Sequence, residues 1–125
     1  MIDVIEEFGM NAGRVWQVLH DQGPLPELEL KMETCLRDKE FYAAVGWLAR
    51  ENKIHRDHDI YQLQDTNLTT EIGPTAGMIW HALEQHGELD TIHMSLMMNQ
   101  DTKTIYSALG WLARENKISL QKKRI

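Results

Sequence analysis

The sequence contains a single cysteine, Cys35, and no long hydrophobic run. One cysteine cannot form a disulfide within the chain, which is typical of proteins from reducing compartments. The wholly apolar runs are only a few residues long, whereas a membrane-spanning helix needs about 20. The first residues, MIDVIEEF, are acidic where a secretory signal would be basic. These absences predict a soluble, cytoplasmic protein that makes no contact with a membrane.

Basic residues are also scarce, because 13 Lys and Arg stand against 19 Asp and Glu, giving a net charge of −6. The first 64 residues carry 7 basic and 12 acidic side chains, and the remaining residues carry 6 and 7. An acidic chain binds nucleic acid only through a local basic surface. The overall charge therefore argues against nucleic-acid binding, and the second half suits it better than the first.

No motif of an enzyme is present: the chain has no Gly-rich phosphate loop, nucleophile elbow or pair of catalytic carboxylates. The histidines do not form a metal site, since His55 and His58 are three residues apart on an expected strand and point to opposite faces. His81 and His86 are five apart on an expected helix and diverge as well. The sequence therefore predicts no catalysis, no cofactor and no metal.

An internal repeat is the clearest feature that is present. The string GWLARENKI occurs at residues 46–54 and again at residues 110–118, an offset of 64. The same offset aligns further Gly, Ala, Trp, Leu and Tyr residues without a gap. The repeat predicts two copies of one unit, at residues 1–64 (with an N-terminal extension) and 72–125, joined by a polar linker at residues 65–71.

The two copies predict the same order of elements. Asn11 and Thr75 are good N-caps for a first helix in each copy, which Gly23 and Gly87 end. Leu28 and Met32, matched by Ile92 and Leu96, predict a short second helix that Asp90 caps in copy two. A longer third helix follows, with apolar residues at i, i+3, i+4 and i+7 and with Asn52 or Asn116 at its end. Strands are expected at residues 53–56 and 60–63, but in copy two only at 118–121.

Helix, short strand, helix, helix and hairpin is the order of a winged helix-turn-helix. The fold class is therefore mainly α (α+β), with two tandem units and a shortened or missing wing in the second. Two motifs also occur twice: Ala-Gly-x-x-Trp (residues 12–16 and 76–80) and the segment from Tyr42 to Ile54, repeated from Tyr106 to Ile118. With these motifs the chain resembles a family of small bacterial winged helix-turn-helix domains of uncharacterised function. The resemblance implies DNA binding as the first expectation and protein binding as the alternative.

A DNA-binding winged helix reads bases with its third helix. The residues that would contact DNA are then those on the outward face of each third helix, one residue of the wing and the basic C-terminal run. They are Arg37, Lys39, Arg56, Thr102, Lys103, Thr104, Ser107, Lys122, Lys123 and Arg124. Copy two is favoured, because Asp38 and Glu40 offset the cations of copy one.

The alternative function is a protein-interaction or structural module. A mid-helix Gly costs about 1 kcal/mol relative to Ala, and both copies keep one between a Tyr and a Trp. These patches predict an interface, either between the repeats as a pseudo-dimer or with a partner. Their residues are Tyr42, Gly46, Trp47, Tyr106, Gly110 and Trp111. The first helices, with the apolar Ile2, Val4, Ile5 and Phe8, are the other candidate contact, and these four residues are expected to lack counterparts in the linker.

Overall fold

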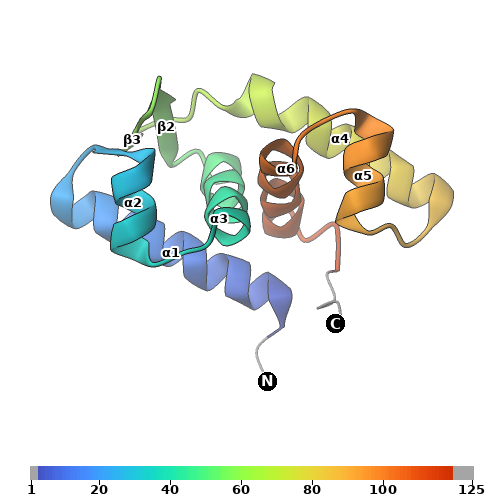
Figure 1. Cartoon of the computed structure of the whole chain (residues 1–125), viewed down its shortest axis with the longest axis horizontal. Coiled ribbons are helices and arrows are strands. Elements are labelled where there is room, and N and C mark those ends of the chain that lie inside the picture. The colour runs from blue at the N-terminus through green and yellow to red at the C-terminus, as the bar shows by residue number, and fades with distance from the viewer. Residues whose placement is uncertain (1–2, 120–125) are drawn as a thin grey trace.

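The computed structural model describes residues 3–119 of the chain. Figure 1 shows two groups of helices that meet along α3 and α6, at the centre of the molecule. The elements are α1 (Val4–Gln22), β1 (Leu25–Pro26), α2 (Glu27–Thr34), α3 (Asp38–Arg50), β2 (Ile54–Asp57), β3 (Ile60–Leu63), α4 (Thr69–His86), α5 (Thr91–Met98) and α6 (Thr102–Arg114).

The first unit is a complete winged helix-turn-helix, as predicted. Its wing is an antiparallel sheet in the order β1-β3-β2. Ile54 pairs with Leu63, and Leu25 of β1 pairs with Tyr61 of β3. The β2–β3 turn passes through His58, which has a φ of 57°. The sheet holds the loop after α1 against the hairpin that follows α3.

In the second unit, α4, α5 and α6 repeat the three helices of the first. Between residue 64 and residue 119 the structure contains no strand. The strand predicted at residues 118–121 is therefore absent over its described part, and residues 120 and 121 lie outside the described residues. As far as residue 119, the second unit has the helix-turn-helix without a wing.

The predicted C-terminal ends of the first and third helices are confirmed, and the residue that ends each helix has a positive φ angle. Gly23 and Gly87 follow α1 and α4 with φ angles of 80° and 75°, and each donates its amide to the carbonyl four residues earlier. Asn52 and Asn116 follow α3 and α6 with φ angles of 61° and 57°. Among L-residues with a side chain, Asn tolerates this region well.

The predicted helix starts at Asn11 and Thr75 are wrong. α1 begins at Val4, where a carboxylate oxygen of Asp3 accepts the amide of Glu6 at 2.8 Å, and α4 begins at Thr69, inside the predicted linker. Both helices start earlier because buried apolar residues continue at helical spacing before Asn11 and Thr75, with Phe8 in α1 and Ile72 in α4. The repeat extends too: the offset of 64 aligns Val4 with Leu68 and Phe8 with Ile72, so two of the apolar residues do have counterparts.

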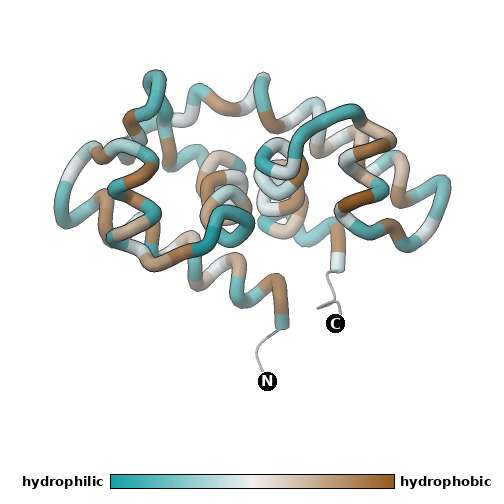
Figure 2. The backbone as a smooth tube through the Cα atoms, in the orientation of Figure 1, coloured by the Kyte–Doolittle hydropathy of each residue, from teal (hydrophilic) through white to brown (hydrophobic). Residues whose placement is uncertain are grey.

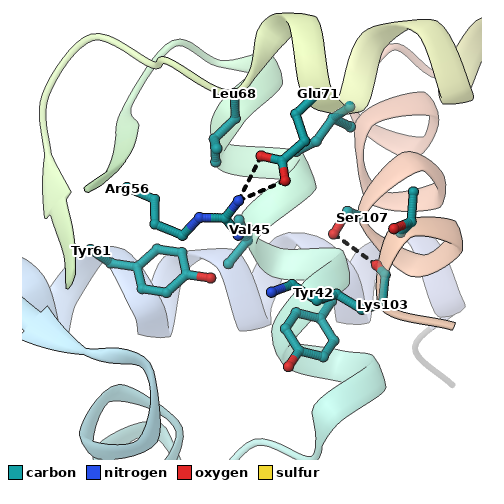
Figure 3. Close-up of a pocket in the computed structure, with 10 residues that line it drawn as sticks. Tyr42, Val45, Arg56, Tyr61, Leu68, Glu71, Lys103 and Ser107 are labelled. Carbon is teal, nitrogen blue, oxygen red and sulfur yellow. Dashed lines mark hydrogen bonds and ion pairs between the residues drawn. The ribbon is translucent and has the colours of Figure 1, made fainter. Parts of the chain in front are cut away.

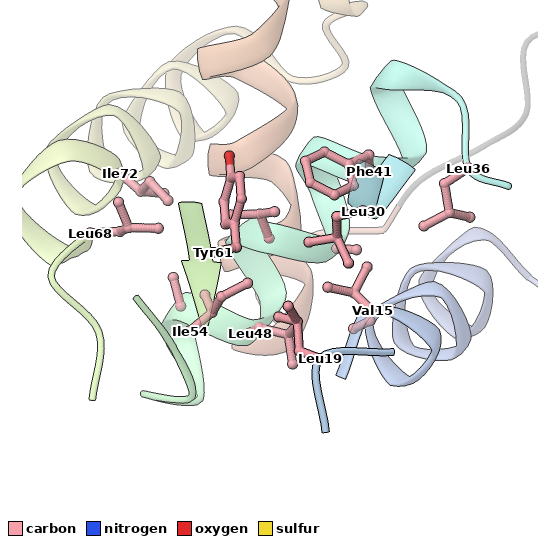
Figure 4. Close-up of a cluster of buried hydrophobic side chains, with 14 residues drawn as sticks. Val15, Leu19, Leu30, Leu36, Phe41, Leu48, Ile54, Tyr61, Leu68 and Ile72 are labelled. Carbon is pink, nitrogen blue, oxygen red and sulfur yellow. The ribbon is translucent and has the colours of Figure 1, made fainter. Parts of the chain in front are cut away.

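The first turns of α1 and α4 each pack into the core of the other unit. Leu68 and Ile72 belong to the start of the second unit but are buried in the core of the first, near Tyr61 (Figure 4). Phe8, in α1 of the first unit, is buried in the core of the second beside Ile105 and its neighbours. Each core is therefore completed by a helix from the other unit.

The second helices form where the sequence predicted them, but they bury a different face. Leu30 is fully buried in α2, and Met94 is buried in α5. The pairs that revealed these helices, Leu28 with Met32 and Ile92 with Leu96, point to solvent and are 63% to 75% exposed. Two helices of the same length therefore each leave an apolar pair uncovered.

The exchanged helices make a prediction about unfolding. Leu68→Ala should lower the free energy of unfolding by about 2–4 kcal/mol, because the residue is 3% exposed and its removal leaves a cavity. Since Leu68 connects α4 with the other unit's core, the whole chain should still unfold in one shifted transition. Urea denaturation followed by tryptophan fluorescence and circular dichroism checks this.

The control for that experiment is Leu28→Ala, at a position that is 68% exposed. It should change the free energy of unfolding by less than about 0.5 kcal/mol. Two separated transitions in the unmodified chain, or equal effects of the two variants, would contradict the exchanged arrangement.

Candidate functional site

The backbones of α3 and α6, one from each unit, come into contact at two glycines. Gly46 in α3 and Gly110 in α6 are both buried. A Cβ added at Gly46 would overlap the carbonyl oxygen of Ser107 and lie 2.7 Å from its carbonyl carbon. A Cβ at Gly110 would meet Ala43 in the same way, also 2.7 Å from the carbonyl carbon. Any side chain at either position would force the helices apart.

Charged side chains flank this contact in reciprocal pairs. Nε of Arg50 lies 3.0 Å from Oε2 of Glu115, and Nε of Arg114 lies 2.9 Å from Oε2 of Glu51. These pairs connect the C-terminal ends of α3 and α6, and one partner of each is only 16% to 18% exposed. The symmetry of the two pairs follows from the repeat.

The aromatic residues of the Tyr–Gly–Trp patches receive cations from the opposite unit. Arg50 lies over the ring of Trp111 at 5.8 Å and Arg114 over the ring of Trp47 at 6.0 Å. At the other end of the helices, Lys103 lies 5.2 Å from the ring of Tyr42. Cation–π contacts at partly exposed sites contribute about 0.5–1 kcal/mol each.

A polar network unique to the first unit surrounds Glu27. Its Oε1 accepts the Tyr61 hydroxyl at 2.7 Å and its Oε2 accepts the Tyr42 hydroxyl at 2.9 Å. Nζ of Lys31 lies 3.3 Å from this carboxylate, and Nζ of Lys103 reaches it from α6 at 3.8 Å. The network therefore connects α2, α3 and the wing with the second unit.

The network shifts the pKa values of its members. Partial burial alone would raise the pKa of Glu27, but the hydrogen bonds from Tyr61 and Tyr42 and the charges of Lys103 and Lys31 hold that pKa below its ordinary value. Burial raises the pKa of Tyr61, and its bond to the carboxylate adds to this. Glu27 is thus a stable anion with two tyrosine donors.

A further ion pair joins the wing to α4 (Figure 3). Nη2 of Arg56 in β2 lies 2.7 Å and 2.6 Å from the two carboxylate oxygens of Glu71. The guanidinium also lies 5.9 Å from the ring of Tyr61. Arg56, predicted to contact DNA from the wing, is therefore engaged with the other unit.

The remaining residues predicted to contact DNA lie in different surroundings. Arg37, Lys39 and Thr102 are exposed, and Lys103 and Thr104 are half-buried. Ser107 is 7% exposed, donates its hydroxyl to the carbonyl of Lys103 and has its own carbonyl against Gly46, so it is not available to DNA. Lys122, Lys123 and Arg124 lie outside the described residues.

The face of each third helix that would read DNA is covered by the other unit. On α3, Ala43 is fully buried and Gly46 is buried against α6. The same holds for Ser107 and Gly110 of α6. The helical spacing shows which face of each third helix points away from its own unit's core. It does not show that the other unit covers this face.

Sequence reasoning missed Glu27 and Glu71. Both lie in the first turn of a helix, where an acidic residue is ordinary. A difference between the two copies would have pointed to Glu27, because the offset of 64 aligns it with Thr91, which has no carboxylate.

Neither a metal site nor a membrane-spanning helix is present between residues 3 and 119. Between residues 3 and 119 no three His, Cys, Asp or Glu side chains are placed to hold a metal ion together. Over the same stretch, no helix combines the length and the apolar character needed to cross a membrane.

The glycine contact makes a second prediction. Gly46→Ala and Gly110→Ala should each lower the free energy of unfolding by about 1–3 kcal/mol or more, because the new Cβ meets backbone that cannot yield like a flexible side chain. Gly13→Ala is the matched control, since nothing lies within 4 Å of a Cβ there. At that mid-helix position, alanine should raise stability by about 0.5–1 kcal/mol. Equal effects in thermal denaturation would contradict the close contact.

The Glu27 network makes a third prediction. Because the pKa of Glu27 is lower in the folded than in the unfolded state, its contribution is complete above about pH 4.3 and is lost as the pH falls through the folded pKa. Glu27→Gln should therefore cost about 1–3 kcal/mol at pH 7, and the difference from the unmodified chain should shrink below about pH 4. A difference that stays constant with pH in urea denaturation would argue against an ionised Glu27.

Comparisons with known proteins bear on the fold. The sequence matches the winged helix-turn-helix domain family DUF2582 twice, over residues 3–64 and 65–124. A search of curated proteins and a search of solved structures found no match. The two matched ranges together span nearly all of the chain and meet where the structure passes from β3 to α4. The chain therefore belongs to the winged helix-turn-helix domain family DUF2582 and contains two copies of that domain in tandem.

Proposed function

We propose that this chain is a regulatory module that binds a protein partner, and that its third helices do not read DNA. The observation that carries the proposal is the backbone contact between α3 and α6 at Gly46 and Gly110. The winged helix-turn-helix fold itself suggests a DNA-binding or regulatory module. The contact between the third helices favours a regulatory module that does not bind DNA through them.

The geometry of DNA recognition is the first support. Paired helix-turn-helix units place their reading helices in major grooves about 34 Å apart. A helix with its side chains is about 10–12 Å wide and occupies a groove alone. Here α3 and α6 lie against each other, so the face that would enter a groove is covered by the other helix (Figure 1).

The distribution of charge is the second support. Several cations near the contact are already paired with carboxylates: Arg50, Arg56 and Arg114 with a glutamate each, and Lys103 with Glu27. With a net charge of −6, the chain has few cations left to neutralise phosphates. A typical specific site makes about 6–10 phosphate contacts.

The uncovered apolar side chains on both second helices are the third support. Leu28 and Met32 on α2 and Ile92, Leu96 and Met97 on α5 are exposed. Figure 2 shows hydrophobic residues recurring along both of these helices. Apolar residues that recur at one exposed position in two copies are typical of a protein-binding surface.

We also propose how the contact between α3 and α6 arose. A single winged-helix unit with a glycine in its third helix can form a two-fold dimer through that helix. The tandem chain would hold the same contact within one polypeptide, as a pseudo-dimer. The Arg50–Glu115 and Arg114–Glu51 pairs would then correspond to two identical ion pairs of the dimer. Residues 1–64 and 72–125 are then two repeats in the sequence whose hydrophobic cores each contain residues of the other repeat.

DNA binding remains the second candidate, because the family fold favours it. It would have to use surfaces away from the α3–α6 contact, such as Arg37 and Lys39 or the C-terminal basic run. The salt dependence of binding would reveal the number of phosphates involved.

A titration with duplex DNA separates the two candidates. Fluorescence anisotropy with a mixed-sequence 30-base-pair duplex in 50 mM salt should show no saturable binding by the intact chain at micromolar concentration. The control is the variant in which Lys39 and Lys103 are both changed to Ala. Saturable binding by the intact chain would overturn the proposal, and its loss in this variant would place the bound DNA near α3 and α6.

A further inference from the structure

We infer that the second unit contains a carboxylate-binding site between α5 and α6, which receives an acidic side chain of a protein partner. The site is a cavity of about 80 Å³. Its lining residues are Lys39, Thr91, Ile92, Thr102, Ile105 and Tyr106. The volume exceeds the roughly 10–15 Å³ that a single water needs, and leaves room for a carboxyl group.

The chain provides its own comparison for this cavity, because the first unit holds a carboxylate at the equivalent position. The offset of 64 aligns Thr91 with Glu27 and Tyr106 with Tyr42. In the first unit, the Tyr42 hydroxyl donates to Glu27 at 2.9 Å. In the second unit, the shorter Thr91 takes the place of the glutamate, and the cavity lies beside it.

Of the two ammonium groups beside Glu27, the one that comes from the other unit is repeated, whereas Ser95 replaces Lys31. Lys103 reaches from α6 across the contact to Glu27 at 3.8 Å and lies 5.2 Å from the Tyr42 ring. Its counterpart Lys39 reaches from α3 across the same contact and lies 5.7 Å from the Tyr106 ring. One of the two ammonium groups and one of the two tyrosines that hold Glu27 are thus kept in the second unit, where position 91 supplies no carboxylate.

Neither Lys39 nor Tyr106 contacts a carboxylate of residues 3–119. Within residues 3–119, Lys39 forms no ion pair and the Tyr106 hydroxyl forms no hydrogen bond. The nearby Asp101 is occupied as the N-cap of α6, where it accepts the amide of Thr104 at 2.8 Å. A charged donor and a neutral donor beside a cavity form a site for a carboxylate from outside the chain.

The surroundings indicate that the carboxylate comes from a protein. Ile92 lines the cavity and is 63% exposed, and Leu96 and Met97 continue the apolar surface along α5. The helix itself carries no acidic residue, whereas α2 carries Glu27, Glu29 and Glu33. A partner segment that places apolar side chains on α5 and one Glu or Asp beside Lys39 matches this pattern. This source of the carboxylate rests on the proposed function, but the site itself does not.

The test uses propionate, the side-chain analogue of glutamate, added to the full chain labelled with ¹⁵N. Propionate should shift the amide signals of Thr91, Ile92 and Tyr106 in a saturable manner. Propionamide, which has the same shape and no charge, should not, and sodium chloride at equal ionic strength should not. Shifts that are equal for propionate and propionamide, or no saturable shift with propionate, would overturn the inference.

Two variants keep the test specific. Thr91→Glu places in the second unit the carboxylate that the first unit has, so it should abolish the propionate shifts. Tyr106→Phe removes only a hydroxyl and should weaken propionate binding about tenfold through the lost charged hydrogen bond. Unchanged propionate affinity in Tyr106→Phe would refute the site even if Thr91→Glu failed to fold.

A peptide separates the two sources of the carboxylate. An amphipathic helical peptide with one glutamate among leucines should bind more tightly than propionate and shift Leu96 and Met97 as well, and its Glu→Gln form should bind about tenfold more weakly. Propionate binding without peptide binding would leave a site for a free carboxylate and refute the protein source. DNA binding by the intact chain would instead refute the proposed function without affecting the propionate result.

Discussion

The structure depends on one contact, in which the backbones of α3 and α6 meet at Gly46 and Gly110. Because a Cβ at either glycine would overlap a carbonyl group of the other helix, the contact exists only while both residues lack a side chain. It places the third helices at the centre, brings Arg50 and Arg114 within reach of glutamates on the opposite helix and allows each first helix to enter the other unit's core. The same contact covers the surface with which a winged helix ordinarily reads DNA.

The two copies have diverged around this shared contact. The first unit keeps its wing and uses Tyr61, Glu27 and Lys31 to connect α2, α3 and the hairpin. In the second unit Thr91 and Ser95 replace the glutamate and the lysine, and no strand is present up to residue 119. One copy is thus closed by internal hydrogen bonds, and we propose that the other offers the equivalent position to a partner.

The sequence predicted the helices and the first wing because these follow from local spacing and from residues such as Gly23 and Asn52 that stop a helix. It also singled out Gly46 and Gly110, since a glycine kept twice inside a helix needs a reason. It could not show which face of α2 is buried, because Leu28 and Met32 have the same helical spacing as a core pair. Nor could local spacing reveal that Leu68 fills the first core, since that depends on the path of α4 across the other unit. The Glu27 network joins residues up to 76 positions apart, and only a comparison of the two copies points to it.

The contact between α3 and α6 is tested most directly by a nuclear Overhauser measurement between the α-protons of Gly46 and Ser107 and between those of Gly110 and Ala43. Both cross-peaks are expected in a uniformly labelled sample. They should be absent from an isotope-filtered spectrum of mixed labelled and unlabelled chains, because the contact lies within one chain. Absence of both cross-peaks from the uniformly labelled sample would contradict the contact, and their appearance in the filtered spectrum would contradict its place within one chain.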